Sequence, residues 1–424
     1  MIETTPARER AYLIGVQLPG TSSKTLGEQM RELAELTRTA GGEVVGTDVQ
    51  RRSEVEPGLF VGRGKVDEIR DRRQDLKLDL VICNEDLSPR QQRNLEKELG
   101  LRVVDRTELI LDIFAQHART REGRLQVEAA QLRHLLPRLI GAYDYHRQMG
   151  GIGTRGGPGE AQVEVERRRI RKRMRDLEQE LAQVRSQRVQ QRSGRQRSDL
   201  PTVAIVGYTN AGKSTLINTL TGAGVRAEDA LFATLDPTTR RLRLPRGRDV
   251  LLTDTVGFIQ KLPTDLVAAF RATLEEVTFA DVVLHVVDAS APAAQEQATT
   301  VDEILAELGA AEKPRVVALN KVDLLGPVTL RRAMRAFSER YETLVPISAL
   351  RGSGLDALGD AIDAATSERY VALEVLIPYG REGVLQELRR YGGLERVEYR
   401  EQGTYVRGRA PRELAHRFEP YATD

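Results

Sequence analysis

The sequence predicts an α/β fold with four parts, and three observations lead to this prediction. Two regions, about residues 11–105 and 202–367, alternate short apolar runs with stretches of helical spacing, which is typical of α/β layers with a largely parallel sheet. Between them, two long stretches repeat apolar residues at steps of three and four, which indicates paired helices. The last part, residues 369–424, follows a β-α-β-β-α pattern that predicts a small α+β C-terminal domain.

Residues 1–106 are predicted to form an N-terminal α/β domain. Its helical stretches are 25–38, which Gly41-Gly42 ends, and 90–99, for which Ser88-Pro89 supplies the N-cap and first helical residue. Five apolar runs are its expected strands: Tyr12–Val16, Val44–Val49, Leu59–Val61, Leu80–Cys83 and Val103–Val104. Cys83 is the only cysteine, so no disulfide can form within the chain, which fits a reducing cytoplasm.

Residues 107–195 are predicted to form an antiparallel helical hairpin. One seam consists of Leu125, Ala129, Leu132, Leu136 and Leu139, and the other of Ile170, Met174, Leu177, Leu181 and Val184. The stretch 150–159, which contains Arg155, has too many glycines to form a helix or a strand. It is therefore predicted to be the loop that connects the two helices.

Composition narrows the class of protein. Charged residues make up 30% of the chain, yet the net charge is only +2, so total charge does not indicate a partner. No apolar run reaches the roughly 18 to 20 residues that a membrane span needs, and the first residues lack the apolar core of a secretory signal. We expect a monomeric cytoplasmic protein without a transmembrane segment, and peripheral association with a membrane stays an open alternative.

A phosphate-binding loop follows the apolar run Thr202–Val206. The pattern G-x-x-x-x-G-K-S directs backbone N–H groups at phosphate oxygens in front of a helix N-terminus. Lys213 is expected to reach the β- and γ-phosphates, and the Ser214 hydroxyl to bind Mg²⁺. The residues of this loop that we assign to the nucleotide are Gly207, Tyr208, Thr209, Asn210, Ala211, Gly212, Lys213, Ser214 and Thr215.

The next segment, Phe232, Ala233 and Thr234, is expected to close on the γ-phosphate. We assign Thr234 to Mg²⁺ and the γ-phosphate, and Thr238 and Thr239 are alternatives nearby.

A third segment consists of Asp254, Thr255, Val256 and Gly257. Asp254 ends an apolar run, where its carboxylate can hold the water shell of the metal, and Gly257 can offer its N–H group to the γ-phosphate. The predicted catalytic residues are therefore Lys213, Thr234 and Gly257, and the predicted metal ligands are Ser214, Thr234 and Asp254.

Two further segments specify the base. Asp323 can accept both N–H groups on the edge of guanine, a pattern that adenine lacks, and a backbone N–H of Ser348-Ala349 can reach the guanine carbonyl. The residues assigned here are Asn320, Lys321, Val322, Asp323, Ser348, Ala349 and Leu350. Five segments in this order predict a P-loop GTPase (Ras-like) domain over residues 196–368, with GTP rather than ATP as its ligand.

Two positions refine the expected chemistry. Phe258 follows Gly257, where many small signalling GTPases carry a glutamine that orients the attacking water. We therefore expect slow intrinsic hydrolysis that a partner completes. Asn210 lies at a loop position that serves as a monovalent-cation ligand in potassium-stimulated GTPases, so K⁺ is a candidate cofactor beside Mg²⁺.

The regions flanking the nucleotide segments resemble the HflX family of GTPases. The resemblance extends from about residue 10 to 367 and is carried by Pro57–Lys65, Asp86–Leu95, Asp105–Phe114, Gln126-Val-Glu128, Leu136–Leu139, Gly150–Arg155, the Phe-Ala-Thr-Leu segment 232–235 and Phe258. It implies a GTPase that binds the large (50S) ribosomal subunit, is stimulated by the ribosome and dissociates 70S ribosomes. It also implies that the N-terminal α/β and hairpin parts engage the ribosome.

A basic segment in the second predicted helix, Arg167–Arg175, is consistent with that implication. Seven cations surround the apolar Ile170 and Met174, which is the pattern of a helix that contacts RNA phosphates. Glu164, Glu166, Asp176, Glu178 and Glu180 lie close enough for a neutralised, solvated coiled-coil face instead. Two other functions also stay open: a GTP-switched scaffold for a protein or membrane partner, and an additional ATP-dependent activity of the N-terminal domain.

Overall fold

The computed structural model describes residues 8–149, 158–196, 200–222, 231–232, 237–261, 274–367, 370–391, 393–411 and 414–423. The chain divides into two compact units. The first consists of residues 1–185 with 230–232 and 262–270, and the second of 186–229, 233–261 and 271–424. The finer division into four domains stays a prediction.

The first unit contains a parallel four-stranded sheet in the order β2-β1-β3-β4. Its strands are β1 (Arg10–Gln17), β2 (Glu43–Arg51), β3 (Leu80–Cys83) and β4 (Arg102–Val104), and its helices are α1 (Ser23–Thr39), α2 (Arg63–Asp75), α3 (Pro89–Leu99) and α4 (Arg106–His117). Every residue of β3 is buried, as expected for a parallel strand covered on both faces. Cys83 is a buried free cysteine.

The predicted helix boundaries follow from their caps. The Ser88 hydroxyl accepts a hydrogen bond from the N–H of Gln91, whose side chain bonds back to Ser88, and Pro89 is the first helical residue of α3. Gly100 ends this helix in the left-handed conformation at φ 62°. The prediction of a strand at Leu59–Val61 was wrong. Phe60 has φ 63° and closes a tight turn by exchanging two backbone hydrogen bonds with Glu56, so this buried apolar run is a turn.

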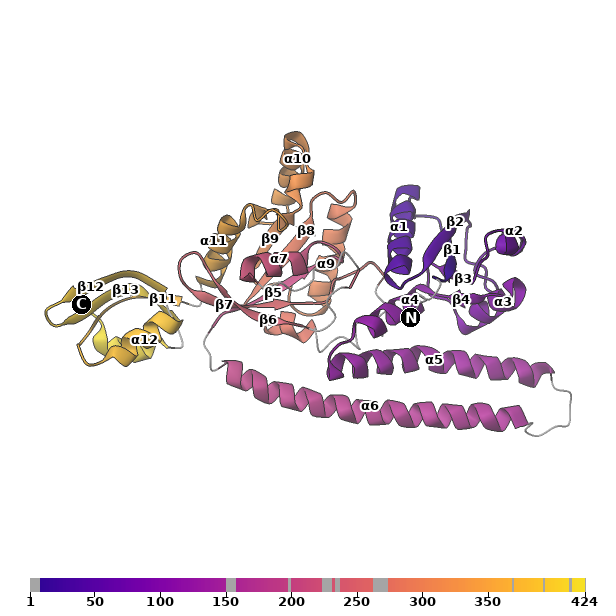
Figure 1. The fold of residues 1–424 in the computed structure, drawn as a ribbon, viewed down its shortest axis with the longest axis horizontal. Helices are drawn as coiled ribbons and strands as arrows, with labels where there is room; N and C mark the ends of the chain where they lie inside the picture. The colour runs from indigo at the N-terminus through magenta and orange to yellow at the C-terminus, as the bar shows by residue number, and fades with distance from the viewer. Residues whose placement is uncertain are drawn as a thin grey trace, which may run out of the picture. The chain divides into compact units, whose positions relative to one another are not determined.

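Helices α5 (Arg121–Met149) and α6 (Pro158–Gln196) run alongside each other (Figure 1). Their direction is antiparallel, since Arg121 pairs with Glu180 and Glu128 with Arg173. Leu125, Ala129 and Leu177 form a buried cluster between them, and Leu132, Leu181 and Val184 pack against it. The loop residues 150–157, including Arg155, lie outside the described residues. Pro158 and Gly159 were predicted in this loop but begin α6, because proline is accepted in the first turn of a helix.

A buried acid joins the α/β layer to α5. Asp105 caps the N-terminus of α4 by accepting a hydrogen bond from the N–H of Glu108 at 2.8 Å, and its side chain is fully buried. Arg138 of α5 forms an ion pair with Asp105 and donates a hydrogen bond to Gln92 of α3 at 2.7 Å. Burial alone would raise the pKa of Asp105, but His134 and Arg138 lower it, so the carboxylate stays charged.

The second unit contains a six-stranded sheet in the order β10-β9-β8-β5-β7-β6, in which only β6 is antiparallel to its neighbour. The strands are β5 (Thr202–Gly207), β6 (Thr239–Arg243), β7 (Asp249–Asp254), β8 (Val282–Asp288), β9 (Arg315–Asn320) and β10 (Leu344–Pro346). The helices are α7 (Lys213–Thr221), α9 (Ala294–Glu307), α10 (Pro327–Ser338) and α11 (Leu355–Thr366), and Val322–Leu324 forms the short 3₁₀ helix η1.

Helices cover both faces of this sheet (Figure 1). Leu216 and Ile217 of α7 share one core cluster with Leu358 and Ile362 of α11, whereas Ala298 of α9 and Phe337 of α10 belong to a separate one. This is the doubly wound arrangement, in which ligands bind outside the carboxyl ends of the strands.

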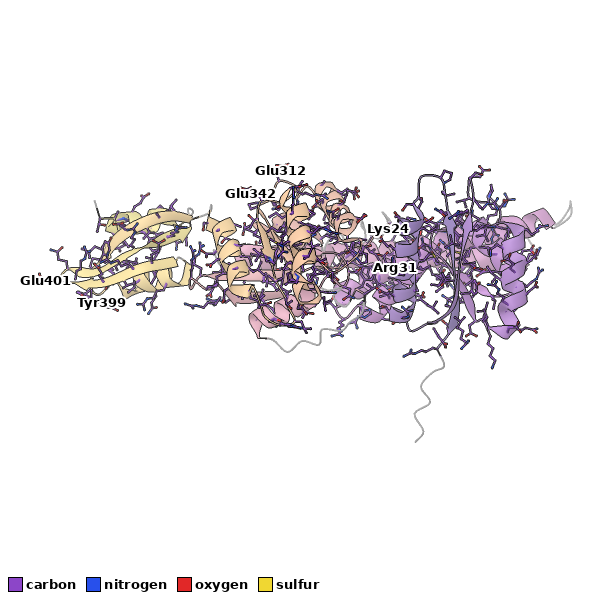
Figure 2. All side chains as sticks on the ribbon, turned by 90° about the horizontal axis from the view of Figure 1, so that it is seen from above. Lys24, Arg31, Glu312, Glu342, Tyr399 and Glu401 are labelled. Atoms are coloured by element: carbon purple, nitrogen blue, oxygen red, sulfur yellow. The ribbon has the colours of Figure 1, made fainter. Side chains whose placement is uncertain are left out.

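The C-terminal sheet also lies in the second unit and has its own core. Its order is β11-β13-β12, all antiparallel, with β11 (Tyr370–Ile377), β12 (Gly393–Arg400) and β13 (Gly403–Pro411). Helices α12 (Glu382–Tyr391) and α13 (Ala415–Phe418) supply Leu388 and Phe418 to that core, and the 3₁₀ helix η3 spans Glu419–Tyr421. Tyr399 and Glu401 lie at the tip of the β12–β13 hairpin (Figure 2).

Candidate nucleotide-binding site

Four of the predicted segments meet at one edge of the sheet in the second unit. Gly207 ends β5, Asp254 ends β7, Asn320 ends β9 and Ser348 follows β10 by two residues. The strands concerned are parallel, so their carboxyl ends lie together at the edge where doubly wound sheets bind ligands. A cavity of about 760 Å³ lies at the opposite edge, before β9 and β10, beside Glu312 and Glu342 (Figure 2). It contains none of the predicted nucleotide residues.

The two glycines that bound the phosphate loop are required by close approaches. A Cβ atom at Gly207 would lie 2.2 Å from the carbonyl oxygen of Val286, and one at Gly212 would lie 2.3 Å from Nδ2 of Asn320. Gly212 also has φ 91°, which favours glycine. The loop therefore passes directly against β8 and the base-recognition segment.

Lys213 starts α7 with its ammonium group held back over the loop. Nζ donates hydrogen bonds to the carbonyl oxygens of Gly207 and Tyr208 at 3.1 and 2.8 Å. Burial lowers the pKa of Lys213 to about 8, although the negative charge of Asp254 raises it in the opposite sense. Burial removes the water that would stabilise the charged ammonium, and an anion bound beside it would stabilise that charge instead.

The residues present fit a magnesium ion. The Ser214 hydroxyl donates a hydrogen bond to Oδ2 of Asp254 at 3.2 Å. Two oxygen atoms of the kind that Mg²⁺ prefers as ligands therefore lie close together beside the phosphate loop. Among the described residues, no three His, Cys, Asp or Glu side chains cluster as a metal cage. Mg²⁺ usually binds to only a few protein ligands, and phosphate oxygens and water molecules complete its coordination shell.

The segment after Asp254 continues along the phosphate loop. The Thr255 hydroxyl donates to the carbonyl oxygen of Ile205 at 2.6 Å, and Phe258 forms a parallel bridge with Tyr208. The Phe258 side chain is buried, with 1% of its surface exposed. Its burial leaves no group at this position that could orient a water molecule.

Asn320 connects the base-recognition segment to the phosphate loop. Its Nδ2 donates to the carbonyl oxygen of Ala211 at 2.8 Å, and its Oδ1 accepts from the N–H of Ala349 at 2.9 Å. Asp323 lies at the start of η1, where the hydrogen bond from Ser348 lowers the pKa of its carboxyl group, and Arg351 adds to this effect at 3.5 Å. The carboxylate that the sequence predicts as the acceptor for guanine is therefore held in its charged form.

Three contacts at this edge were not anticipated from the sequence. Lys321, at φ 62°, forms an ion pair with Asp288 at 2.8 Å, Arg351 pairs with Asp323, and the Tyr208 hydroxyl accepts a hydrogen bond from the N–H of Gln260 at 2.9 Å. Asp288 follows the apolar run of β8 in the same way as the predicted residues follow theirs, so strand-end position was a usable signal for it.

The other predicted residues differ in where they lie. Ala233 and Thr234 fall outside the described residues. Phe232 belongs to the first compact unit, where its ring packs edge-to-face on Phe114 with centroids 4.6 Å apart. Leu350 is 81% exposed beside the base-recognition segment. The remaining predicted residues, Thr209, Asn210, Thr215, Val256 and Val322, lie in the described loops and helices of the nucleotide edge.

Comparison with known proteins is consistent with this geometry. Residues 202–321 match a family model described as 50S ribosome-binding GTPase. Residues 27–115 match one described as GTP-binding GTPase N-terminal, and residues 117–195 one described as GTP-binding GTPase middle region. The GTPase HflX of Caldanaerobacter subterraneus subsp. tengcongensis is 44% identical over 99% of this chain and 95% of its own length.

The chain belongs to the HflX family of GTPases. The HflX GTPase of Escherichia coli is also similar, at 43% identity over 94% of this chain and 92% of its own length. A crystal structure of a GTP-binding protein from Sulfolobus solfataricus with GDP is 26% identical and covers 85% of this chain and 99% of that one, with a TM-score of 0.46. As a member of the HflX family, the chain binds GTP and hydrolyses it. No helix in the described ranges is long and apolar enough to cross a membrane.

Proposed function

We propose that this HflX-family GTPase is a cytoplasmic factor that binds the 50S ribosomal subunit in its GTP state, is stimulated by the ribosome, and dissociates 70S ribosomes. The single observation that carries the proposal is an exposed row of cations on α6. The description of the matching family as 50S ribosome-binding GTPases supports it.

Six of the seven cations in the basic segment of α6 fall into two groups with different surroundings; the seventh, Arg169, is exposed and belongs to neither group. Arg167 and Arg173 flank the packed seam and are ion-paired: Arg167 with Glu164 at 3.0 Å, and Arg173 through two nitrogens with Glu128 of α5 at 2.6 and 2.7 Å. These two arginines belong to the fold of the hairpin, and Arg173 lowers the pKa of Glu128.

The second group, which we call the α6 cation row, consists of Arg168, Arg171, Lys172 and Arg175. All four are exposed, and their spacing of three, one and three residues places them on the helix face opposite Ile170 and Leu177. Within the described part of the chain, the row forms one ion pair, between Arg168 and Glu164 at 3.7 Å, and the Arg168 side chain is 79% exposed. Unneutralised cations at this spacing favour contact with RNA phosphates over a balanced solvated face.

We assign the nucleotide roles as follows. Lys213 binds the β- and γ-phosphates, Gly257 offers its N–H group to the γ-phosphate, and Asp323 with Ala349 recognises guanine. Ser214 and Asp254, together with Thr234, hold Mg²⁺, which bridges phosphate oxygens and offsets the charge that develops in transfer. Asn210 is exposed in the left-handed conformation at φ 58°, and we assign it to K⁺. Equal hydrolysis rates in K⁺ and Na⁺ would remove that assignment.

Phe258 explains the expected dependence on the ribosome. A buried phenylalanine can neither donate nor accept a hydrogen bond to the attacking water, so another group must orient it. We assign that contribution to the ribosome-bound state.

Cosedimentation with purified 50S, 30S and 70S particles tests this function. We expect retention on 50S with a non-hydrolysable GTP analogue, weaker retention with GDP, and release of 50S from 70S in the analogue's presence. Retention on none of the particles would contradict the proposal and favour a scaffold for another partner.

A pair of matched triple variants tests the surface. Arg171→Ala/Lys172→Ala/Arg175→Ala should weaken 50S binding at least about tenfold. The slope of the logarithm of the binding constant against the logarithm of the salt concentration should become shallower by about two to three. The control is Arg331→Ala/Arg332→Ala/Arg335→Ala, which removes equal charge from exposed positions on α10. Equal effects of the two triples would show that only total charge matters.

A further inference from the structure

A three-bond clasp holds residues 258–260 against the phosphate loop. The N–H of Phe258 donates to the carbonyl oxygen of Gly207 at 3.1 Å, and the N–H of Thr209 donates to the carbonyl oxygen of Phe258 at 2.8 Å. The third bond runs from the N–H of Gln260 to the hydroxyl oxygen of Tyr208 at 2.9 Å. Of these three bonds between described residues, two are made by backbone groups alone, and the third depends on the Tyr208 side chain.

The clasp follows an irregularity in the sheet. Ile205 pairs with Asp254, and the next pair along is Tyr208 with Phe258. The chain therefore advances three residues on the loop side and four on the other, so one extra residue lies between the two pairs, as in a bulge. Residues 255–257 accommodate the extra residue, so the position of Gly257 depends on the pairing on either side of it.

Gly257 lies where a γ-phosphate would be sensed. A Cβ atom at this residue would lie 3.0 Å from Nζ of Lys213 and 3.0 Å from Cα of Thr209, so its backbone passes directly beside the loop and its ammonium. Lys213 and Gly257, two of the residues assigned to the γ-phosphate, are thus held together by the clasp that follows Gly257.

We propose that Tyr208 is a positioning residue for GTP hydrolysis, acting through Gln260 to hold Gly257 beside Lys213. The proposal rests on the γ-phosphate roles assigned to these two residues. The Tyr208 side chain is itself fixed, because only 5% of it is exposed and its backbone forms the bridge to Phe258. Its hydroxyl is therefore held in place to accept the hydrogen bond from the N–H of Gln260, which follows the bulge.

Tyr208→Phe removes this hydroxyl and keeps the ring. GDP has no γ-phosphate for Gly257 to contact, so its affinity should change less than twofold. The affinity for a non-hydrolysable GTP analogue and the single-turnover rate of hydrolysis should both fall about three- to tenfold, the effect of losing one hydrogen bond. Fluorescence titration with labelled GDP and analogue, and rapid-quench measurement of hydrolysis, give the three quantities.

Tyr341→Phe is the matched control. Tyr341 is similarly buried in the same unit, and its hydroxyl donates to Asp302 at 2.8 Å near the opposite edge of the sheet. We expect it to leave the ratio of GDP to analogue affinity unchanged, even if both tyrosine variants lower the melting temperature.

Three results would overturn the proposal: parallel loss of GDP and analogue affinity in Tyr208→Phe, no change in either analogue affinity or hydrolysis, or the same ratio shift in Tyr341→Phe. The assigned roles are tested separately, since Lys213→Ala should abolish binding of both nucleotides. If Lys213→Ala retains GDP binding, the site assignment fails; if only Tyr208→Phe is silent, the positioning role fails.

Discussion

Asn320 and Ala211 are joined by a 2.8 Å hydrogen bond across 109 residues of chain, from the amide nitrogen of one to the carbonyl oxygen of the other. The other atom of the same amide accepts from Ala349 at 2.9 Å. One buried side chain thus connects the phosphate loop, the base-recognition strand and the loop after β10.

Asn320→Ala should weaken GDP and GTP analogue binding by the same factor, at least about tenfold. The substitution leaves a buried carbonyl and a buried N–H without their partners, which costs about 1–3 kcal/mol each. Titration with both nucleotides measures the factor, and a loss confined to the analogue would contradict this role.

Asp323→Asn should exchange guanine preference for xanthine. In the proposed site the carboxylate would accept from two N–H groups on guanine, whereas an amide would present one donor and one acceptor, which suits the additional carbonyl of xanthine. Competition between GDP and XDP gives the measurement. Unchanged guanine preference would show that another residue reads the base.

The pH dependence of GDP binding should report Lys213. Its pKa is lowered to about 8 by burial, and a bound phosphate would raise it by favouring the charged ammonium. Above pH 8 the lysine must then take up a proton on binding, so affinity should fall by up to about tenfold per pH unit, with little change between pH 7 and 8.

Calorimetry in two buffers of different ionisation enthalpy checks this directly. Proton uptake should appear at pH 8.5 and be small at pH 7.5, and keeping below pH 9 leaves guanine itself protonated. Absence of uptake at pH 8.5 would mean that Lys213 is already charged before the nucleotide binds.

Arg248→Ala should lower the free energy of unfolding of the second unit by about 3–5 kcal/mol, because the buried Asp363 carboxylate then keeps only the exposed Arg246 as an ion-pair partner, at 3.9 Å. Arg248 and Asp363 are only 6% and 3% exposed, and Nε donates to Oδ1 at 2.6 Å. Chemical denaturation measures the loss. The double replacement Arg248→Leu/Asp363→Leu should cost less than Arg248→Ala, and a larger cost would contradict the explanation.

Local patterns in the sequence were enough to predict the α/β class, the helical hairpin and the strand-end placement of the nucleotide segments. Capping residues such as Ser88 and strand ends such as Asp254 act over a few residues, so they can be read directly. The strand predicted at Leu59–Val61 was wrong because an apolar run can be buried in a turn as well as in a strand. No local sequence pattern indicates the left-handed conformation of Phe60. The Asn320–Ala211 and Tyr208–Gln260 bonds depend on tertiary register, which no local pattern encodes.

Helix α6 separates its two tasks by position around its axis. Arg173 serves the hairpin, and its charge is already cancelled by Glu128. Arg171, Lys172 and Arg175 face away from the seam, so replacing them should leave the melting temperature nearly unchanged. Residues on the outer face can therefore change without affecting the packing of the hairpin. A relative could differ in the proposed RNA contact of this helix, or in the salt dependence of that contact, while keeping the same fold.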